Sequence, residues 1–155
     1  MLDLEADYVP DLLQFMARVR ERLRETFGDA TAAEHGRVAV CVAPATARYE
    51  PHCLHAHRLV FPGVSTFDVQ ATAPVFGWRA FPDFSSARAH WTDPAQYLYV
   101  EQPNGACHMA TATRPLGRQF FRGVIAAQVS SPELADWRRF PRLEVICDAL
   151  GVLGR

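Results

Sequence analysis

Three of the six histidines in the chain lie within the segment HCLHAHRLVFP, residues 52–62. They are His52, His55 and His57, and Cys53 lies among them. A neutral imidazole titrates near neutral pH, so it can serve as a nucleophile, a general base or a metal ligand. On a β-strand, residues two apart point the same way, so His55 and His57 can share one metal ion or one phosphate group. Three interpretations are open: a strand that only packs, a metal site, or a nucleophile with orienting partners.

The metal interpretation draws on one more side chain, that of Glu50. With it, residues 50–57 hold a carboxylate and three histidines, which can form an open Zn²⁺ or Fe²⁺ site that leaves a water molecule for chemistry. The ligands would be Glu50, His52, His55 and His57. This alternative predicts a metal enzyme of small-molecule metabolism, such as a lyase, a cyclase or an isomerase.

The composition indicates one globular domain, residues 1–155, with a substantial core. Hydrophobic residues make up 49% of the chain and charged residues 21%, which are globular values. The formal net charge of −1 gives no bulk attraction to nucleic acid or to an anionic membrane. No apolar run is long enough for a transmembrane helix, the N-terminus lacks a signal-peptide core, and the four cysteines are scattered. These features favour a cytoplasmic protein with reduced thiols.

Hydrophobic periodicity predicts a long helix near the start of the chain. Residues 8–27 carry an apolar side chain every three or four positions, as one helical face requires, with Pro10 in the first turn and Gly28 after the last. The apolar positions are Val9, Leu12, Leu13, Met16, Val19, Leu23 and Phe27. Residues 116–129 and 141–153 also have helical patterns.

Short runs rich in β-branched and aromatic residues predict strands between these helices. The predicted strands are residues 37–43, 54–61, 96–102 and 107–113. The tripeptide EHG, residues 34–36, comes directly before the first, Pro62 and Gly63 end the second, and a turn at 103–105 joins the last two. The whole pattern predicts an α+β fold in which helices flank an antiparallel sheet.

The order of these motifs resembles the histidine triad (HIT) superfamily. The resemblance lies in RERLRETFG at 20–28, EHG at 34–36 and HAHRLVFP at 55–62, followed by QYLYVE at 96–101, RQFFR at 118–122 and DWRRFPRLE at 136–144. Together these segments extend over roughly residues 8–150. EHG and HAH with the trailing proline are moderately specific together, and the later segments follow in the family's order.

The resemblance implies a HIT-like antiparallel sheet, usually in a dimer, and an enzyme that needs no cofactor. HIT proteins hydrolyse or transfer nucleotidyl groups of dinucleoside polyphosphates, nucleoside phosphoramidates or nucleotide sugars. The middle histidine of the family's His-x-His-x-His motif attacks the α-phosphorus and forms a nucleotidyl-histidine. Counting back from Pro62 gives His57 the middle position and His55 the first, which would orient it or contact phosphate. His52 would be an auxiliary ligand or proton carrier.

The sequence departs from the family pattern at two motif positions. The third motif position is Leu59, which can neither donate nor accept a hydrogen bond, and loss of one transition-state contact costs on the order of 10²-fold in rate. The position before it, apolar in the family, is Arg58, which we expect to face a helix layer or to reach a carboxylate elsewhere.

A further departure concerns the family's N-terminal half, which precedes the long helix in a full HIT domain and is missing here. We therefore expect a homodimer, or a heteromer with a chain that supplies that half. A non-catalytic subunit of a hetero-oligomer is the third interpretation of the whole protein.

Other residues could support the site. His35, Gln119 and Arg122 are candidates for binding substrate phosphate. Gln119 and Arg122 lie three apart and would share a helix face, whereas Glu34 and His35 could instead cap a turn. The expected ligand is a small, phosphate-containing molecule.

Overall fold

Helices and antiparallel strands make up the part of the chain that the computed structural model describes, which comprises residues 1–37, 57–69, 76–93, 95–113, 116, 119–136, 139 and 143–153. The strands are β1 (Ala30–Gly36), β2 (His57–Pro62), β3 (Arg79–Phe81), β4 (Tyr97–Glu101) and β5 (Cys107–Thr111). The α-helices are α1 (Val9–Phe27), α3 (Phe84–His90), α4 (Phe120–Gln128) and α5 (Leu143–Leu153), and two short 3₁₀ helices are η1 (Ala6–Tyr8) and η3 (Pro132–Ala135). The predicted α+β class is confirmed.

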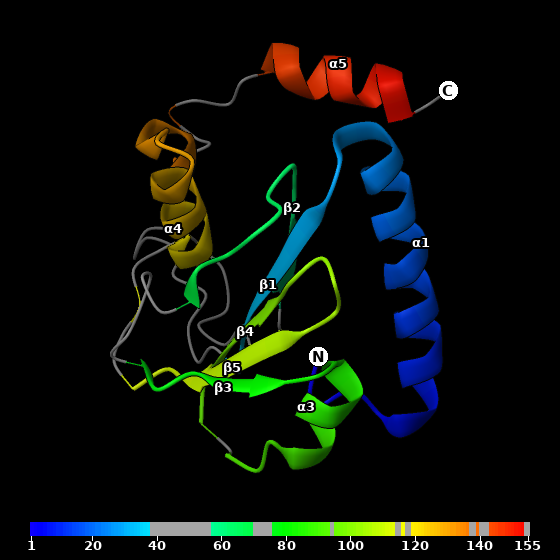
Figure 1. Cartoon of the computed structure of the whole chain (residues 1–155), viewed down its shortest axis with the longest axis vertical. Coiled ribbons are helices and arrows are strands. Elements are labelled where there is room, and N and C mark those ends of the chain that lie inside the picture. Colours follow the sequence, from blue (N-terminus) through cyan, green and yellow to red (C-terminus); the bar gives the residue numbers. More distant parts are fainter. Residues whose placement is uncertain are drawn as a thin grey trace, which may run out of the picture.

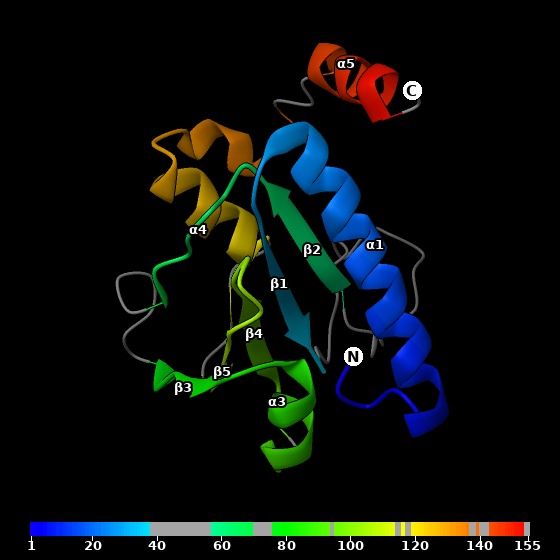
Figure 2. The same ribbon diagram turned by 45° about the vertical axis from the view of Figure 1, so that its right-hand side comes forward.

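The five strands form one sheet in the order β2-β1-β4-β5-β3, and every neighbouring pair is antiparallel. Helix α1 runs along one side of this sheet and α4 lies on the other (Figures 1 and 2). Helix α3 packs on the same side as α1, because Phe84 and Ala87 belong to one buried cluster with Tyr97 and Tyr99 of β4. Helix α5 lies across the end of the molecule where α1 ends (Figure 1).

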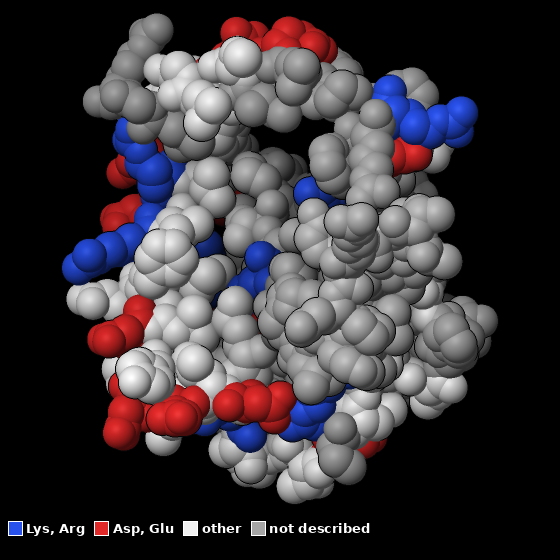
Figure 3. All heavy atoms as spheres, turned by 180° about the vertical axis from the view of Figure 1, so that it is seen from behind, with Lys and Arg blue, Asp and Glu red and all other residues white. Residues whose placement is uncertain are grey.

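Helix α1 confirms the prediction for residues 8–27. Pro10 lies in its first turn, where a missing amide proton costs no helical hydrogen bond. Gly28 caps the end with a φ of 81°, a conformation that favours glycine. Arginine and carboxylate side chains alternate along the outer side of α1, at the left of Figure 3. The helix therefore presents a mixed, solvated surface on one face and apolar side chains on the other.

Strand β1 was not predicted from the sequence. It begins at Ala30, and EHG forms its last three residues, so the motif lies within a strand. The first residues of β1 are mostly alanines, which have low β-propensity, so the sequence pattern did not predict a strand there. The strand is stabilised by pairing with β2 on one side and with β4 on the other. Arg37 then leaves the sheet with a φ of 55°, and the remainder of the predicted strand 37–43 lies outside the described residues.

The remaining predictions differ mainly in their boundaries. Strand β2 covers the second half of the predicted strand 54–61, and the predicted hairpin of β4 and β5 is present with its turn at residues 103–105. Helix α4 begins at Phe120 rather than at residue 116, because Gln119 adopts a left-handed conformation with a φ of 55°. Helix α5 lies within the predicted segment 141–153.

Successive residues of each strand point to opposite faces of the sheet, so the fold has two buried layers. The layer under α4 is an apolar cluster that includes Ala33, Leu98, Val100, Phe121 and Ile125. The layer under α1 and α3 contains tyrosines and charged side chains as well as apolar ones. Within the described residues, no helix is both long enough and apolar enough to cross a membrane.

Candidate active site at the β1–β2 pair

The two histidine-bearing motifs lie on neighbouring strands. Strands β1 and β2 pair in a register that puts His35 of EHG opposite His57 of HAH. The same register pairs Glu34 with Arg58 and Ala33 with Leu59. Directly opposite residues of antiparallel strands share a face of the sheet and have Cβ atoms about 4.5–5.5 Å apart. The fold thus brings together two motifs that the sequence separates by eighteen residues (positions 37–54).

His35 is a partly buried imidazole with one free nitrogen. It lies on the α4 face, since its neighbour Glu34 has its partners on the α1 face. Burial lowers the pKa of His35 below its usual 6.5, and a hydrogen bond with Gln96 opposes that shift in part. Nε2 is itself buried and has no hydrogen-bond partner among the described residues. Burial therefore favours a neutral ring whose Nε2 is not paired with another described group.

Of the predicted histidine cluster, the structure describes only the backbone of His57. Glu50, His52 and His55 lie outside the described residues, and for His57 the backbone position in β2 is described. No group of three or more possible metal ligands occurs within the described residues, which do not include that cluster. The metal alternative for these four residues therefore stays a prediction.

Arg122 lies beside β2 as part of a mostly apolar cleft. The cleft has a volume of about 420 Å³ and runs between β2 and α4. Its walls are Leu59, Val60, Phe61, Pro62, Gly63, Val64, Arg122, Ile125, Ala126 and Val129. Small-molecule sites have volumes of about 300–1,000 Å³, apolar walls and few polar groups, and this cleft has those features, with Arg122 the one charged residue among the described residues that line it.

Gln119 and Arg122 lie at the start of α4. Gln119 is the N-cap residue, in a left-handed conformation with a φ of 55°, and Arg122 is the third residue of the helix, so the prediction that both lie within the helix is corrected for Gln119. Arg122 lines the cleft beside β2. The binding of phosphate by Gln119 stays a prediction.

The two motif positions that depart from the HIT pattern have structural roles on opposite faces. Leu59 is partly buried and packs against the apolar cluster under α4. Arg58 is almost fully buried on the other face, with its side chain 2% exposed. Its Nε donates to Glu34 Oε2 at 3.2 Å, and its Nη1 donates to Glu101 Oε2 at 3.4 Å. The expectation that Arg58 reaches a carboxylate under a helix is confirmed.

Aromatic rings and further polar groups complete the surroundings of Arg58. Its guanidinium carbon lies 4.9 Å from the centroid of the Phe84 ring and 4.6 Å from that of Tyr99, within cation–π range. The Tyr99 hydroxyl donates to Glu101 Oε2 at 2.7 Å, and Arg20 of α1 pairs with Glu101 Oε1. This arrangement connects α1, β1, β2 and β4 through ionic contacts.

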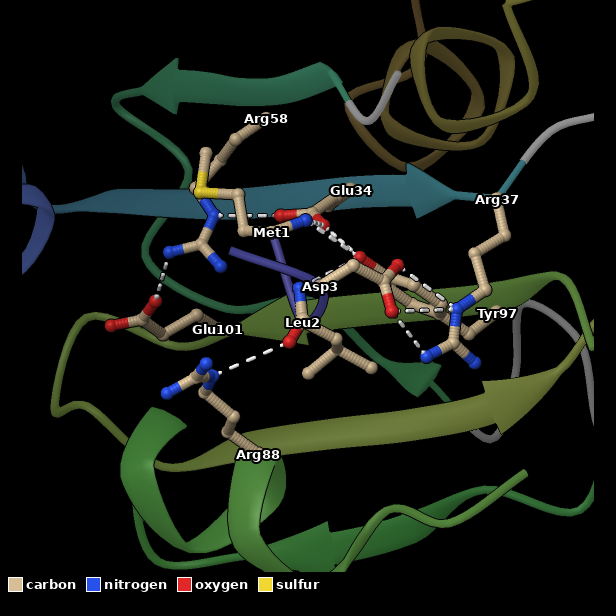
Figure 4. A network of polar contacts seen from close by, with 9 residues as sticks. All are labelled: Met1, Leu2, Asp3, Glu34, Arg37, Arg58, Arg88, Tyr97 and Glu101. Atoms are coloured by element: carbon tan, nitrogen blue, oxygen red, sulfur yellow. Dashed lines mark hydrogen bonds and ion pairs between the residues drawn. The ribbon is translucent and has the colours of Figure 1, made fainter. Parts of the chain in front are cut away.

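Glu34 is a buried ion-pair partner in the middle of the sheet and not a turn cap. It is 1% exposed and accepts hydrogen bonds from Arg58, from the Tyr97 hydroxyl and from the amino group of Met1 (Figure 4). The pKa of Tyr97 is raised by burial and by the adjacent Glu34 carboxylate, so the phenol remains a donor. One feature of the sequence pointed to this network, namely Arg58 at a motif position that is apolar in the HIT pattern.

Gly36 of EHG has a steric explanation. A Cβ atom at this position would lie 1.9 Å from Cζ of Tyr97, its register partner on β4. Because the Tyr97 ring crosses the strand there to reach Glu34, only glycine fits. The glycine of the motif therefore serves the buried network.

Cys107 and His108 do not form a metal pair. As consecutive residues of β5 they point to opposite faces, and Cys107 lies with Tyr97, Tyr99 and Met109 in the cluster under α1 and α3. Burial raises the pKa of Cys107 to about 11, so its thiol stays protonated. Burial also lowers the pKa of His108, whose Nδ1 has no partner among the described residues.

Comparison with known proteins adds no family name to these observations. No protein-family model matches the chain, and no curated protein is a significant match to it. The functional argument therefore rests on the residues and on their arrangement in the sheet.

Proposed function

We propose that the protein is a HIT-type nucleotide-processing enzyme that hydrolyses or transfers a nucleotidyl group through His57. The observation that carries this proposal is the β1–β2 register, in which His35 of EHG lies opposite His57 of HAH. These are the two most specific motifs of the HIT resemblance, and a shared site requires them to be neighbours. The strand also ends at the motif proline, Pro62.

The cleft between β2 and α4 supports a nucleotide as the ligand. Its apolar walls suit a base and ribose, and the Arg122 guanidinium can form paired hydrogen bonds with phosphate oxygens. The residues of β2 that line the cleft begin at Leu59, two positions after His57. The cleft and His57 would therefore belong to one elongated site. Because Leu59 packs against the core, this site takes no polar contact from the third motif position.

The chemistry would proceed through a covalent intermediate. A ring nitrogen of His57 attacks the α-phosphorus, a P–N bond forms, and the P–O or P–N bond to the leaving group breaks. His55 would orient His57 or contact phosphate, and His52 would carry a proton. Transfer of the nucleotidyl group to water gives a nucleoside monophosphate and regenerates His57.

The test is turnover of dinucleoside polyphosphates, nucleoside phosphoramidates and nucleotide sugars, followed by chromatography. We expect the wild type to release a nucleoside monophosphate and His57→Asn to release none. His90→Asn is the matched control, because His90 is exposed and bonds only locally, with its Nδ1 2.8 Å from the Ser86 carbonyl oxygen. Absence of release from every substrate by the wild type would overturn the proposal.

A chelator distinguishes the metal alternative in the same assay. The histidine-nucleophile mechanism needs no metal, so release is expected to be unchanged after dialysis against EDTA. Loss of turnover on chelation, with recovery on addition of Zn²⁺ or Fe²⁺, would instead favour Glu50, His52, His55 and His57 as ligands of a metal enzyme.

A further inference from the structure

Two partly buried histidines lie on the α4 face of the sheet, at different distances from the proposed nucleophile. His35 is on β1, which pairs with β2, and His108 is on β5, which is separated from β1 by β4. Each ring has one nitrogen with no hydrogen-bond partner among the described residues, Nε2 in His35 and Nδ1 in His108. Of the two, only His35 lies directly opposite His57.

Burial decides the charge of the His35 ring. It disfavours the imidazolium form and lowers the pKa below the usual 6.5, so the folded protein favours the neutral ring. A neutral imidazole carries a proton on one nitrogen and a lone pair on the other. Nε2 is buried and has no hydrogen-bond partner among the described residues, so it is the nitrogen to which the proposal below assigns the lone pair.

Among the described residues next to His35 and His57, two other positions can be compared for this role. Leu59, the next position on the same face of β2, is apolar and packs against the cluster under α4. Glu34, which neighbours His35 in β1, is on the other face and is occupied by Arg58 and Tyr97. Across from His57, the β1 position thus supplies a neutral base.

We propose that His35 is a further catalytic residue, the base that activates water for hydrolysis of the nucleotidyl-His57 intermediate. This inference rests on the proposed function. The water oxygen forms a bond to phosphorus, one water proton moves to Nε2 of His35, and the P–N bond breaks with its electron pair returning to His57. The products are a nucleoside monophosphate, neutral His57 and protonated His35, which then releases its proton to solvent.

The experiment separates the two chemical steps. An adenosine 5′-phosphoramidate with a fluorescent amine as leaving group reports the first step as amine release, and intact-protein mass spectrometry reports the nucleotidyl-enzyme. His35→Asn keeps an amide near Nδ1 but removes Nε2, and His35→Gln puts an amide near Nε2 that accepts no proton. His108→Asn is the matched control on the same face. Thermal unfolding of each variant confirms that it is folded.

We expect both His35 variants to give a burst of amine equivalent to the enzyme and then to turn over about 10²–10⁴-fold more slowly than the wild type. The nucleotidyl-enzyme should accumulate in these variants, while the wild type and His108→Asn show neither effect. Free imidazole should accelerate the slow phase.

Two outcomes overturn the inference, and only the second also overturns the proposed function. Turnover of both His35 variants within a few-fold of the wild type, without accumulated nucleotidyl-enzyme, excludes His35 as the base and leaves the proposed function intact. Absence of any amine release by the wild type, in a burst or at steady state, overturns the proposed function itself, and the inference with it.

Discussion

The two faces of the sheet bury their polar groups in different ways. On the face under α1 and α3, the buried charged groups Glu34, Arg58 and Glu101 form ion pairs with one another, although Arg58 Nη2 makes no hydrogen bond among the described residues. On the face under α4, His35 and His108 each have a buried ring nitrogen without a partner among the described residues, and their burial favours the neutral ring. Both kinds of group come from the same strands, and Glu34 and His35 are adjacent in β1.

The difference indicates that the face under α1 and α3 holds the strands together and that the face under α4 carries the proposed chemistry. Charged groups in a low-dielectric interior are stable only as hydrogen-bonded pairs, so Arg58 and its two carboxylates fix how β1, β2 and β4 sit together. A neutral imidazole costs less to bury than an ion, about 1–3 kcal/mol when a nitrogen has no partner, and it can still accept a proton. The ionic face therefore sets the β1–β2 register, and the other face uses that register to bring His35 opposite His57.

Removal of Arg58 is expected to have the largest effect on stability. Arg58→Ala leaves Glu34 and Glu101 without their shared cation, although Arg20 still pairs with Glu101. Loss of one partner of a buried ion pair costs about 3–5 kcal/mol. Urea unfolding followed by circular dichroism measures the loss, and Arg58→Lys serves if the alanine variant does not fold.

An arginine on the surface provides the comparison. Arg22 pairs with Glu25 at 3.5 Å on exposed α1 and has 46% of its side chain exposed. Arg22→Ala is expected to lower the free energy of unfolding by about 0.5 kcal/mol or less. Equal losses for the two variants would show that the Arg58 network does not hold the sheet together.

Restoring the HIT motif at its third position is expected to have a smaller destabilising effect. Leu59→His replaces an apolar side chain that packs against the α4 cluster with a polar one. Burial of a polar group without a partner costs about 1–3 kcal/mol. The free energy of unfolding should fall by that amount, and the substitution should not increase turnover, because the site is built around an apolar residue.

Leu59→Met is the control for this substitution, since it conserves volume and hydrophobicity and costs less than about 1.5 kcal/mol. A Leu59→His protein that is as stable as the Leu59→Met protein would mean that the position is not part of the packed layer. A gain in turnover would show that the third motif position still faces the substrate.

The sequence predicted best those elements whose signal is local. Helix α1 has a regular apolar period, and the β4–β5 hairpin has alternating strands with a turn at residues 103–105. Strand β1 was missed because its alanines carry no local β signal and its pairing with β2 and β4 is long-range. The start of α4 was misplaced because the left-handed backbone at Gln119 is not encoded by an apolar period.

The candidate site was predictable as a set of residues but not as an arrangement. The residue types pointed to His35 and His57, yet their opposition depends on strand register, which no single segment determines. Arg58 was expected to reach a carboxylate, but its partners lie 24 and 43 positions away, at Glu34 and Glu101. The pairing of β1 with β2 and with β4 brings these carboxylates next to Arg58, and that pairing cannot be inferred from one segment of the sequence.

The smallest expected effect is a difference in how stability depends on pH. Burial lowers the pKa of His35 and of His108 below the usual 6.5, so each takes up its proton in the unfolded chain before it does in the folded one. Their contribution to stability is therefore fully present above about pH 6.5 and is lost as pH falls below it, by at most about 1.4 kcal/mol per pH unit for each histidine. Urea unfolding at about pH 8 and about pH 5.5 measures this loss.

The variant with both His35→Asn and His108→Asn should lose less stability over this interval than the wild type, because the asparagines do not titrate. His90→Asn should leave the pH dependence unchanged, since His90 is exposed. The carboxylates Asp3, Asp83 and Asp93 have pKa values lowered from 3.8 by hydrogen bonds, so their contribution is lost only at more acidic pH. An unchanged pH dependence in the double variant would mean that both imidazoles are protonated in the folded protein as readily as in the unfolded chain. The argument that burial keeps His35 neutral and able to act as a base would then fail.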